Sequence, residues 1–189
     1  MASTYLTRNP GSAGNRQKWT FSAWVKRASL GASQAMFTAG FGQNNVDTLK
    51  FTSTDRINWF SYDGNTDYSL ETNRRFRDVN AWYHIQAVLD TTNATANDRV
   101  IIYVNGERET SLATNTMPSQ NYNGIFNNNS TAHYIGRYGW NSNEYFDGEM
   151  SHVHFSDGYA LAPTVFGSTD STTGEWKINT SPSFTLGTN

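Results

Sequence analysis

Three acidic residues lie close together in the segment Glu144-Tyr145-Phe146-Asp147-Gly148-Glu149. Carboxylates that alternate along one strand face the same side, and a pair of them can act as the acid and the nucleophile of glycoside hydrolysis. Asp147 and Glu149 have this spacing, but Glu144 is offset by an odd number of residues and would face the other side. The spacing disfavours a glycan-degrading enzyme, and we expect no catalytic residues and no enzymatic activity.

Two of the four histidines, His152 and His154, are spaced two residues apart on an expected strand. This spacing places both imidazoles on one face, where they could chelate a metal ion. No third ligand follows from the spacing, so packing against a neighbouring strand or exposure to solvent is the expected role. The chain has no cysteine, which excludes disulfides and metal sites built from thiolates.

Aromatic and amide side chains gather in the segment Arg137-Tyr138-Gly139-Trp140-Asn141-Ser142-Asn143-Glu144, and again in Asn121-Tyr122-Asn123. Exposed aromatic rings stack on the apolar faces of sugars, and amides hydrogen-bond to sugar hydroxyls. The alternative is that Trp140 and Tyr122 only cover an edge of the fold. The candidate glycan-binding residues are Tyr122, Tyr138, Trp140, Asn141 and Asn143.

The elements that would position these residues are strands. Residues 19–26 alternate, with Trp19, Phe21, Ala23 and Val25 on one face. Residues 81–91 and 99–105 are the strongest strand candidates, and an Asn-Gly turn follows the second. Because each alternating strand must bury one face, we predict an all-β fold with two antiparallel sheets in a sandwich. Residues 115–131 are expected to form a long ordered loop.

The composition narrows the classes of partner. The chain has 189 residues and a formal net charge of −2, so it lacks the basic surface that nucleic acid requires, and we expect no nucleic-acid partner. Arg74-Arg75-Phe76-Arg77 reads as a solvated turn facing Asp78 and Glu71. No apolar run reaches the length of a membrane span and the first residues contain no signal peptide. We therefore expect synthesis in the cytoplasm and no membrane insertion.

Several motifs distributed over the whole length carry a resemblance to a known family. The chain resembles laminin-G-like, concanavalin-A-like jelly-roll domains, in particular those of structural proteins of tailed marine phages. The motifs are Lys18-Trp19-Thr20-Phe21-Ser22-Ala23-Trp24, Trp82-Tyr83-His84, Tyr103-Val104-Asn105-Gly106, Tyr145-Phe146-Asp147-Gly148 and Asp157-Gly158-Tyr159-Ala160-Leu161.

The resemblance implies a jelly roll over residues 1–167, followed by a C-terminal extension, 168–189, that packs on the sandwich or begins a linker. It implies a structural role for His84 and a possible Ca²⁺ ion. Calcium takes oxygen ligands, but no spacing selects a set among the candidate residues. These are Asp47, Asp63, Asn65, Asp67, Asp90, Asp98 and Asp147.

For function, the resemblance implies a phage virion structural protein: a capsid decoration, a head fibre or a tail-fibre module. The expected role is adhesion to surface glycans, and the alternative is an architectural cement protein that stabilises the particle. The expected partners are other virion proteins, a host-surface polysaccharide and further copies of the chain, with the virion as its location.

Overall fold

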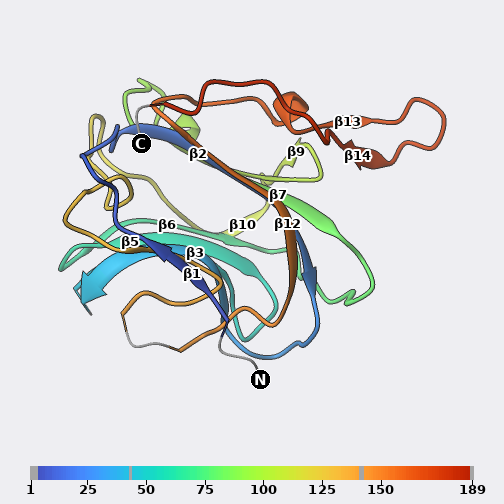
Figure 1. The fold of residues 1–189 in the computed structure, drawn as a ribbon, viewed down its shortest axis with the longest axis horizontal. Helices are drawn as coiled ribbons and strands as arrows, with labels where there is room; N and C mark the ends of the chain where they lie inside the picture. Colours follow the sequence, from blue (N-terminus) through green and yellow to red (C-terminus); the bar gives the residue numbers. More distant parts are fainter. Residues whose placement is uncertain (1–3, 43, 141–142, 188–189) are drawn as a thin grey trace.

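The computed structural model describes residues 4–42, 44–140 and 143–187 of the chain. Two large antiparallel sheets face each other, which confirms the predicted all-β sandwich (Figure 1). The larger sheet has the strand order β1-β11-β3-β4-β5-β6-β10 and the smaller one β12-β2-β7-β8-β9, while β13 and β14 form a separate pair. The strands are β1 Leu6–Arg8, β2 Lys18–Arg27, β3 Gln34–Gly42, β4 Asn45–Phe51, β5 Ile57–Tyr62, β6 Thr66–Thr72, β7 Tyr83–Asp90, β8 Val100–Val104, β9 Glu107–Arg108, β10 Leu112–Thr116, β11 His133–Ile135, β12 Gly148–Asp157, β13 Gly167–Thr169 and β14 Trp176–Ile178.

Strand β2 shows why the alternating segments become strands. Trp19, Phe21, Ala23 and Val25 are at most 1% exposed, as the alternation predicts. The turn that joins β8 to β9 is the predicted Asn-Gly turn. Asn105 and Gly106 both have positive φ, 51° and 81°, the geometry that two-residue hairpin turns favour.

The core lies between the two large sheets. In the larger sheet, the register aligns Phe37, Leu49, Trp59 and Leu70 across β3 to β6, and all four are buried. Phe126, from the segment after β10, stacks on Phe37 with ring centroids 4.3 Å apart. The long loop expected at 115–131 thus enters the core. It also begins later than expected, because Leu112–Thr116 forms β10 at the edge of the sheet, beside β6.

The C-terminal extension packs on the outer face of the smaller sheet (Figure 1). Trp176 stacks on the buried His84, with ring centroids 5.9 Å apart, and its Nε1–H donates to His84 Nδ1 at 3.1 Å. His84 Nε2 lies 2.8 Å from the hydroxyl of Ser22. Since Nδ1 accepts a hydrogen bond, the imidazole is neutral, and burial lowers its pKa to about 4. The division of the chain at residue 167 stays a prediction.

Short features connect the strands. The two 3₁₀ turns are η1 Ala96–Asp98 and η2 Pro163–Val165. Within the described ranges, no helix is long and apolar enough to cross a membrane.

The basic turn, residues 74–77, was expected to face Asp78 and Glu71. Its arginines instead pair with other carboxylates: Arg74 contacts Glu109 at 3.1 Å and Arg77 contacts Asp55 at 3.0 Å.

Candidate functional site

The segment between β11 and β12 folds back on itself as a hairpin, called here the 136–146 hairpin. The Phe146 N–H donates to the Gly136 carbonyl at 2.9 Å, and the Tyr138 N–H donates to the Asn143 carbonyl at 3.1 Å. Trp140 therefore lies at the far end of the hairpin, between these two paired sides.

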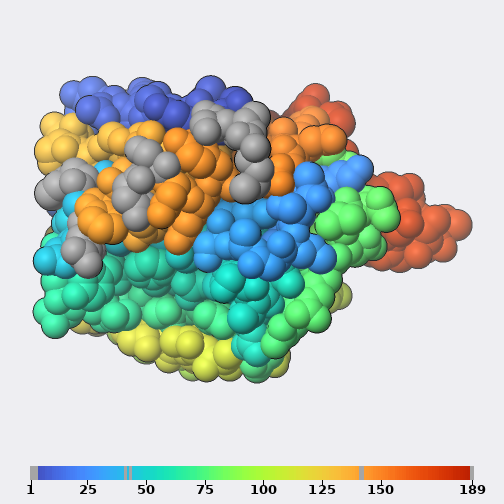
Figure 2. Space-filling view, turned by 90° about the horizontal axis from the view of Figure 1, so that it is seen from below, coloured from blue at the N-terminus to red at the C-terminus, as the bar shows by residue number. Residues whose placement is uncertain are grey.

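This hairpin covers the outer face of the larger sheet. The register places Thr38 beside Thr48 and beside Tyr134, on the face opposite the core residues. Thr38 and Thr48 are nevertheless fully buried. Gly139 lies against Thr38, since a Cβ on Gly139 would be 3.1 Å from Thr38 Cγ2. Figure 1 shows the orange segment beneath the larger sheet, and Figure 2 shows it from outside, lying across that face.

Lys50 of β4 anchors the hairpin electrostatically. Its Nζ lies 2.9 Å from Glu144 Oε2 and 5.3 Å from the centre of the Tyr138 ring. The Ala35 N–H adds a hydrogen bond to the Glu144 carbonyl at 2.8 Å. Burial, with the nearby Glu144 carboxylate, raises the pKa of Tyr138, so its hydroxyl stays neutral. The contact with Lys50 therefore holds the Tyr138 ring in place on this surface.

Beside the hairpin, an arginine lies between two tyrosine rings. The Arg137 guanidinium carbon is 4.4 Å from the ring centres of both Tyr5 and Tyr134. The Tyr5 ring also lies 6.2 Å from that of Tyr145. Gly139, which precedes Trp140, lies against the Tyr134 ring. Trp140 is 43% exposed and Tyr5 38%, so aromatic rings and a cation share one accessible surface. We call Tyr5, Tyr134, Arg137, Trp140 and Tyr145, together with Tyr138 and Asn143, the hairpin surface.

The sequence prediction found part of this surface. Tyr138, Trp140 and Asn143 lie on the hairpin, whereas Asn141 lies outside the described residues. Tyr122 does not join them. Its hydroxyl is 3.2 Å from the buried Ser61 hydroxyl, and its ring meets Tyr68 edge to face.

Ser61 and Tyr68 lie on the core side of the larger sheet, so the sheet separates Tyr122 from the hairpin surface. Burial raises the pKa of the Tyr122 hydroxyl. Tyr122 packs against the core. A role of Tyr122 in glycan binding stays a prediction.

The three carboxylates considered for catalysis do not form one cluster. Glu144 is paired with Lys50 on the outer face of the larger sheet. Asp147 and Glu149 line a different hollow of about 420 Å³, together with Lys26. Glu144 therefore does not share a site with Asp147 and Glu149, and the expected lack of catalysis stays a prediction.

Two of the candidate metal ligands, His154 and Asp47, have other partners. His154 stacks on Phe166, with ring centroids 5.6 Å apart. Asp47 is fully buried and accepts hydrogen bonds from Trp59 Nε1 at 3.0 Å and the Tyr68 hydroxyl at 2.6 Å. Over residues 4–42, 44–140 and 143–187, no three side chains of His, Cys, Asp or Glu form a metal-binding group. A Ca²⁺ site stays a prediction.

A family model described as the concanavalin A-like lectin/glucanases superfamily, Laminin_G_3, matches residues 1–166. The chain belongs to this family. The match covers both large sheets and the hairpin surface of this laminin-G-like domain. A comparison with curated proteins found no match.

Solved structures with the same fold include domains LG4-5 of the mouse laminin α1 chain, with a TM-score of 0.60, 14% identity and coverage of 83% of this chain and 41% of the laminin chain. The CBM40 of the Ruminococcus gnavus IT-sialidase has a TM-score of 0.59, 16% identity and coverage of 86% and 96%. Domain 4 of AbnA, an arabinanase from Geobacillus stearothermophilus in complex with arabinotriose, has a TM-score of 0.53, 18% identity and coverage of 81% and 65%. At these identities the likeness shows the fold, and this chain spans less than half of the laminin chain.

Four members of the hairpin surface were not among the candidate glycan-binding residues of the sequence: Tyr5, Tyr134, Arg137 and Tyr145. Strand alternation could have predicted the outward position of Tyr134, because its neighbours on β11, His133 and Ile135, face inward. Tyr5 has no comparable local signal. It reaches the surface because β1 pairs with β11, and their separation of more than 120 residues hides this contact from local patterns.

A second polar hollow of about 520 Å³ lies between the C-terminal extension and the turn after β8. Trp82, Asn105, Glu107, Glu175 and Trp176 are among its lining residues. The ring of Trp176 is already covered, by His84 and by Gly106, whose Cβ position would fall 2.4 Å from it. This hollow therefore offers less free aromatic surface than the hairpin surface does.

Proposed function

We propose that this laminin-G-like domain is a non-catalytic module that binds glycans through the hairpin surface. The observation that carries the proposal is the exposed Trp140 at the end of a hairpin that is fixed to the outer face of the larger sheet. A ring held in place before binding loses little conformational entropy when a sugar stacks on it.

The chemistry around Trp140 suits a neutral or acidic sugar. The rings of Trp140 and Tyr5 provide apolar faces, Arg137 provides a guanidinium for hydroxyl or carboxylate oxygens, and Asn143 is exposed. Structures of the same fold support the proposal, because one of them is the CBM40 bound to α2,3 sialyllactose and another is the AbnA domain in complex with arabinotriose.

We place this binding on a phage particle, as the sequence resemblance implies. In this proposal the domain is attached to other virion proteins as a capsid decoration or as part of a head or tail fibre. Several copies on one particle would strengthen a weak single-site contact through avidity. Host-surface polysaccharide is the proposed ligand.

The architectural alternative, a cement protein, is favoured by exposed apolar side chains away from Trp140. Leu6 is 68% exposed and Leu186 61%, and exposed apolar patches often mark protein interfaces. A cement role predicts that these leucines, together with the hairpin surface, are buried between subunits.

The test is a glycan array probed with the purified wild-type domain and with Trp140→Ala. We expect wild-type binding to at least one class of glycan and a loss of at least about fivefold in affinity for Trp140→Ala, since stacking on one aromatic ring contributes about 1 kcal/mol or more. Trp82→Ala is the matched comparison, because Trp82 is 37% exposed and lines the second hollow.

Trp82→Ala should retain wild-type binding. A loss of binding in Trp82→Ala, with Trp140→Ala unaffected, would move the site to the second hollow. Absence of binding to every glycan would leave the cement role as the better account.

A further inference from the structure

An apolar pocket of about 300 Å³ opens at one edge of the sandwich, where β1 of the larger sheet and β12 of the smaller sheet are both edge strands. We call it the edge pocket. Phe37 and Ile135 from the larger sheet and Phe155 from the smaller one line it, together with Leu6. Its volume lies at the lower end of the range for small-molecule sites, about 300–1,000 Å³.

The register explains why this pocket exists. Leu6 is paired with Ile135, and Ile135 with Phe37, so all three face the interior of the sandwich. Phe155 approaches from the other sheet, with its ring centroid 5.6 Å from that of Phe37. Leu6 is nevertheless 68% exposed, because the smaller sheet does not extend over β1. Interior-facing apolar surface is thus left open to solvent at this edge.

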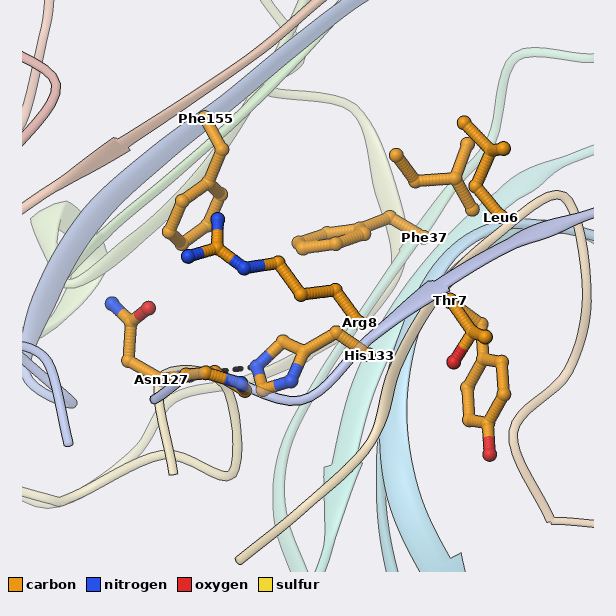
Figure 3. A pocket seen from close by; sticks show the side chains of 10 residues that line it. Leu6, Thr7, Arg8, Phe37, Asn127, His133 and Phe155 are labelled. Carbon is orange, nitrogen blue, oxygen red and sulfur yellow. Dashed lines mark hydrogen bonds between the residues drawn. The ribbon is translucent and has the colours of Figure 1, made fainter. Parts of the chain in front are cut away.

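A cation also faces this apolar opening. Arg8 lies two residues after Leu6 on β1 and is paired with His133, so it faces the same side as Leu6. Figure 3 shows its side chain extending across the pocket toward Phe155 and Asn127. In the described part of the chain, Arg8 forms no ion pair with a carboxylate.

The other polar side chains that line the pocket are neutral. His133 Nε2 accepts the Asn127 N–H at 2.9 Å, and Nδ1 lies 2.9 Å from the Thr131 carbonyl, to which it must donate. Burial keeps the pKa of His133 near 4. The Asn127 amide is bonded to the Asn15 carbonyl and to Asp157 Oδ1. Arg8 therefore supplies the positive charge at the opening.

We propose that the edge pocket binds a small anionic amphiphile: an unbranched apolar chain that ends in a carboxylate, as in a medium-chain fatty acid. The chain occupies the space between Phe37, Phe155 and Ile135, and the carboxylate pairs with the Arg8 guanidinium at the opening. Tyr134 borders both the edge pocket and the hairpin surface. The two sites lie on opposite faces of the sheet, because Leu6 and Arg8 face the interior whereas the Tyr134 position, between their partners, faces outward. The proposal does not depend on glycan binding.

The test is calorimetric titration of the wild-type domain with octanoate, hexanoate, 1-octanol and octylammonium. Octanoate should bind with one-to-one stoichiometry. Each buried methylene contributes about a fourfold gain in affinity, so hexanoate should bind about 15-fold more weakly than octanoate. A hydrogen-bonded ion pair contributes about tenfold, so 1-octanol should bind about tenfold more weakly than octanoate, and octylammonium more weakly than 1-octanol.

Two variants locate the site. Arg8→Gln should reduce octanoate affinity to that of 1-octanol and leave 1-octanol unchanged. Arg75→Gln, an exposed arginine of the basic turn, is the matched control and should behave as wild type. Ile135→Phe should fill the pocket and abolish binding of both ligands, with thermal unfolding used to verify that the variant is folded.

Three results would overturn the proposal. One is equal affinity for octanoate and 1-octanol in the wild type. Another is unchanged octanoate binding in Arg8→Gln or in a folded Ile135→Phe. The third is tighter binding of N-acetyl-leucine than of octanoate, which would assign the pocket to the carboxyl end of a peptide.

Discussion

At the scale of single residues, the buried Asp47 has a consequence for stability. It is fully buried on the core side of the larger sheet, and burial raises its pKa to about 7 from the usual 3.8. The folded protein therefore holds this proton more tightly than the unfolded chain does. Its contribution to the free energy of unfolding should fall as pH rises from about 4 to about 7 and then level off.

Asp47→Asn should remove this dependence, because an amide can accept from Trp59 and donate to the Tyr68 hydroxyl without ionising. His84 and His133 act in the opposite sense. Their pKa values near 4 cause a gain of stability as pH rises from about 4 to 6.5.

We would therefore compare the free energy of unfolding of the wild type with that of Asp47→Asn, measured by denaturant unfolding at pH 4 to 8. We expect the wild type to lose stability relative to the variant by a few kcal/mol across this range. If the free energy of unfolding depended on pH in the same way in both proteins, the raised pKa of Asp47 would be contradicted.

Residue identity alone placed three candidate residues on the hairpin surface, and their role in binding stays a prediction. Tyr138, Trp140 and Asn143 were found because an aromatic ring or an amide within a glycine-containing loop has few structural reasons to be there. Tyr122 has the same local signal, but its segment enters the core. Local composition cannot separate these two cases, because burial is decided by strands far away in the chain.

At the scale of elements, the contact between β14 and the smaller sheet is the feature to test. Trp176→Ala removes both the stacking on His84 and the hydrogen bond to its Nδ1. We expect a loss of about 2 kcal/mol in the free energy of unfolding and faster hydrogen exchange in residues 163–187. Trp176→Phe keeps the stacking and should lose about 1 kcal/mol.

If both substitutions left hydrogen exchange in the extension unchanged, His84 and Trp176 would not be what attaches it. The sequence offered two readings of this segment, a packed extension or a linker. The Trp176 contact agrees with the first, but it depends on a partner 92 residues earlier in the chain, which no local pattern identifies.

The Asn105–Gly106 turn supports the same contact from the other side. Gly106 has φ of 81°, and a Cβ there would overlap the Trp176 ring. Gly106→Ala should lower the free energy of unfolding by about 1–3 kcal/mol through backbone strain, with a further loss from displacement of Trp176. Combining Gly106→Ala with Trp176→Ala should cost less than the sum of the two, and strict additivity in the measured unfolding energies would contradict the contact.

At the scale of the whole molecule, the sandwich has two outer faces with different roles. The C-terminal extension covers the face of the smaller sheet, and the 136–146 hairpin lies on the face of the larger one (Figure 1). Strand alternation predicted the two sheets, because each strand must bury one side. Which outer face each connecting segment covers depends on strand order, and that order is non-local in both sheets.

The central claim, that glycans bind at the hairpin surface, is tested most directly by the six indole N–H signals of the tryptophans in an NMR titration with the best ligand of the glycan array. Trp19 and Trp59 are fully buried and Trp176 is covered by His84, so these signals serve as internal references. The account predicts a progressive shift of the Trp140 signal, assigned by its loss in Trp140→Ala. A shift of the Trp82 signal with Trp140 unmoved would contradict it.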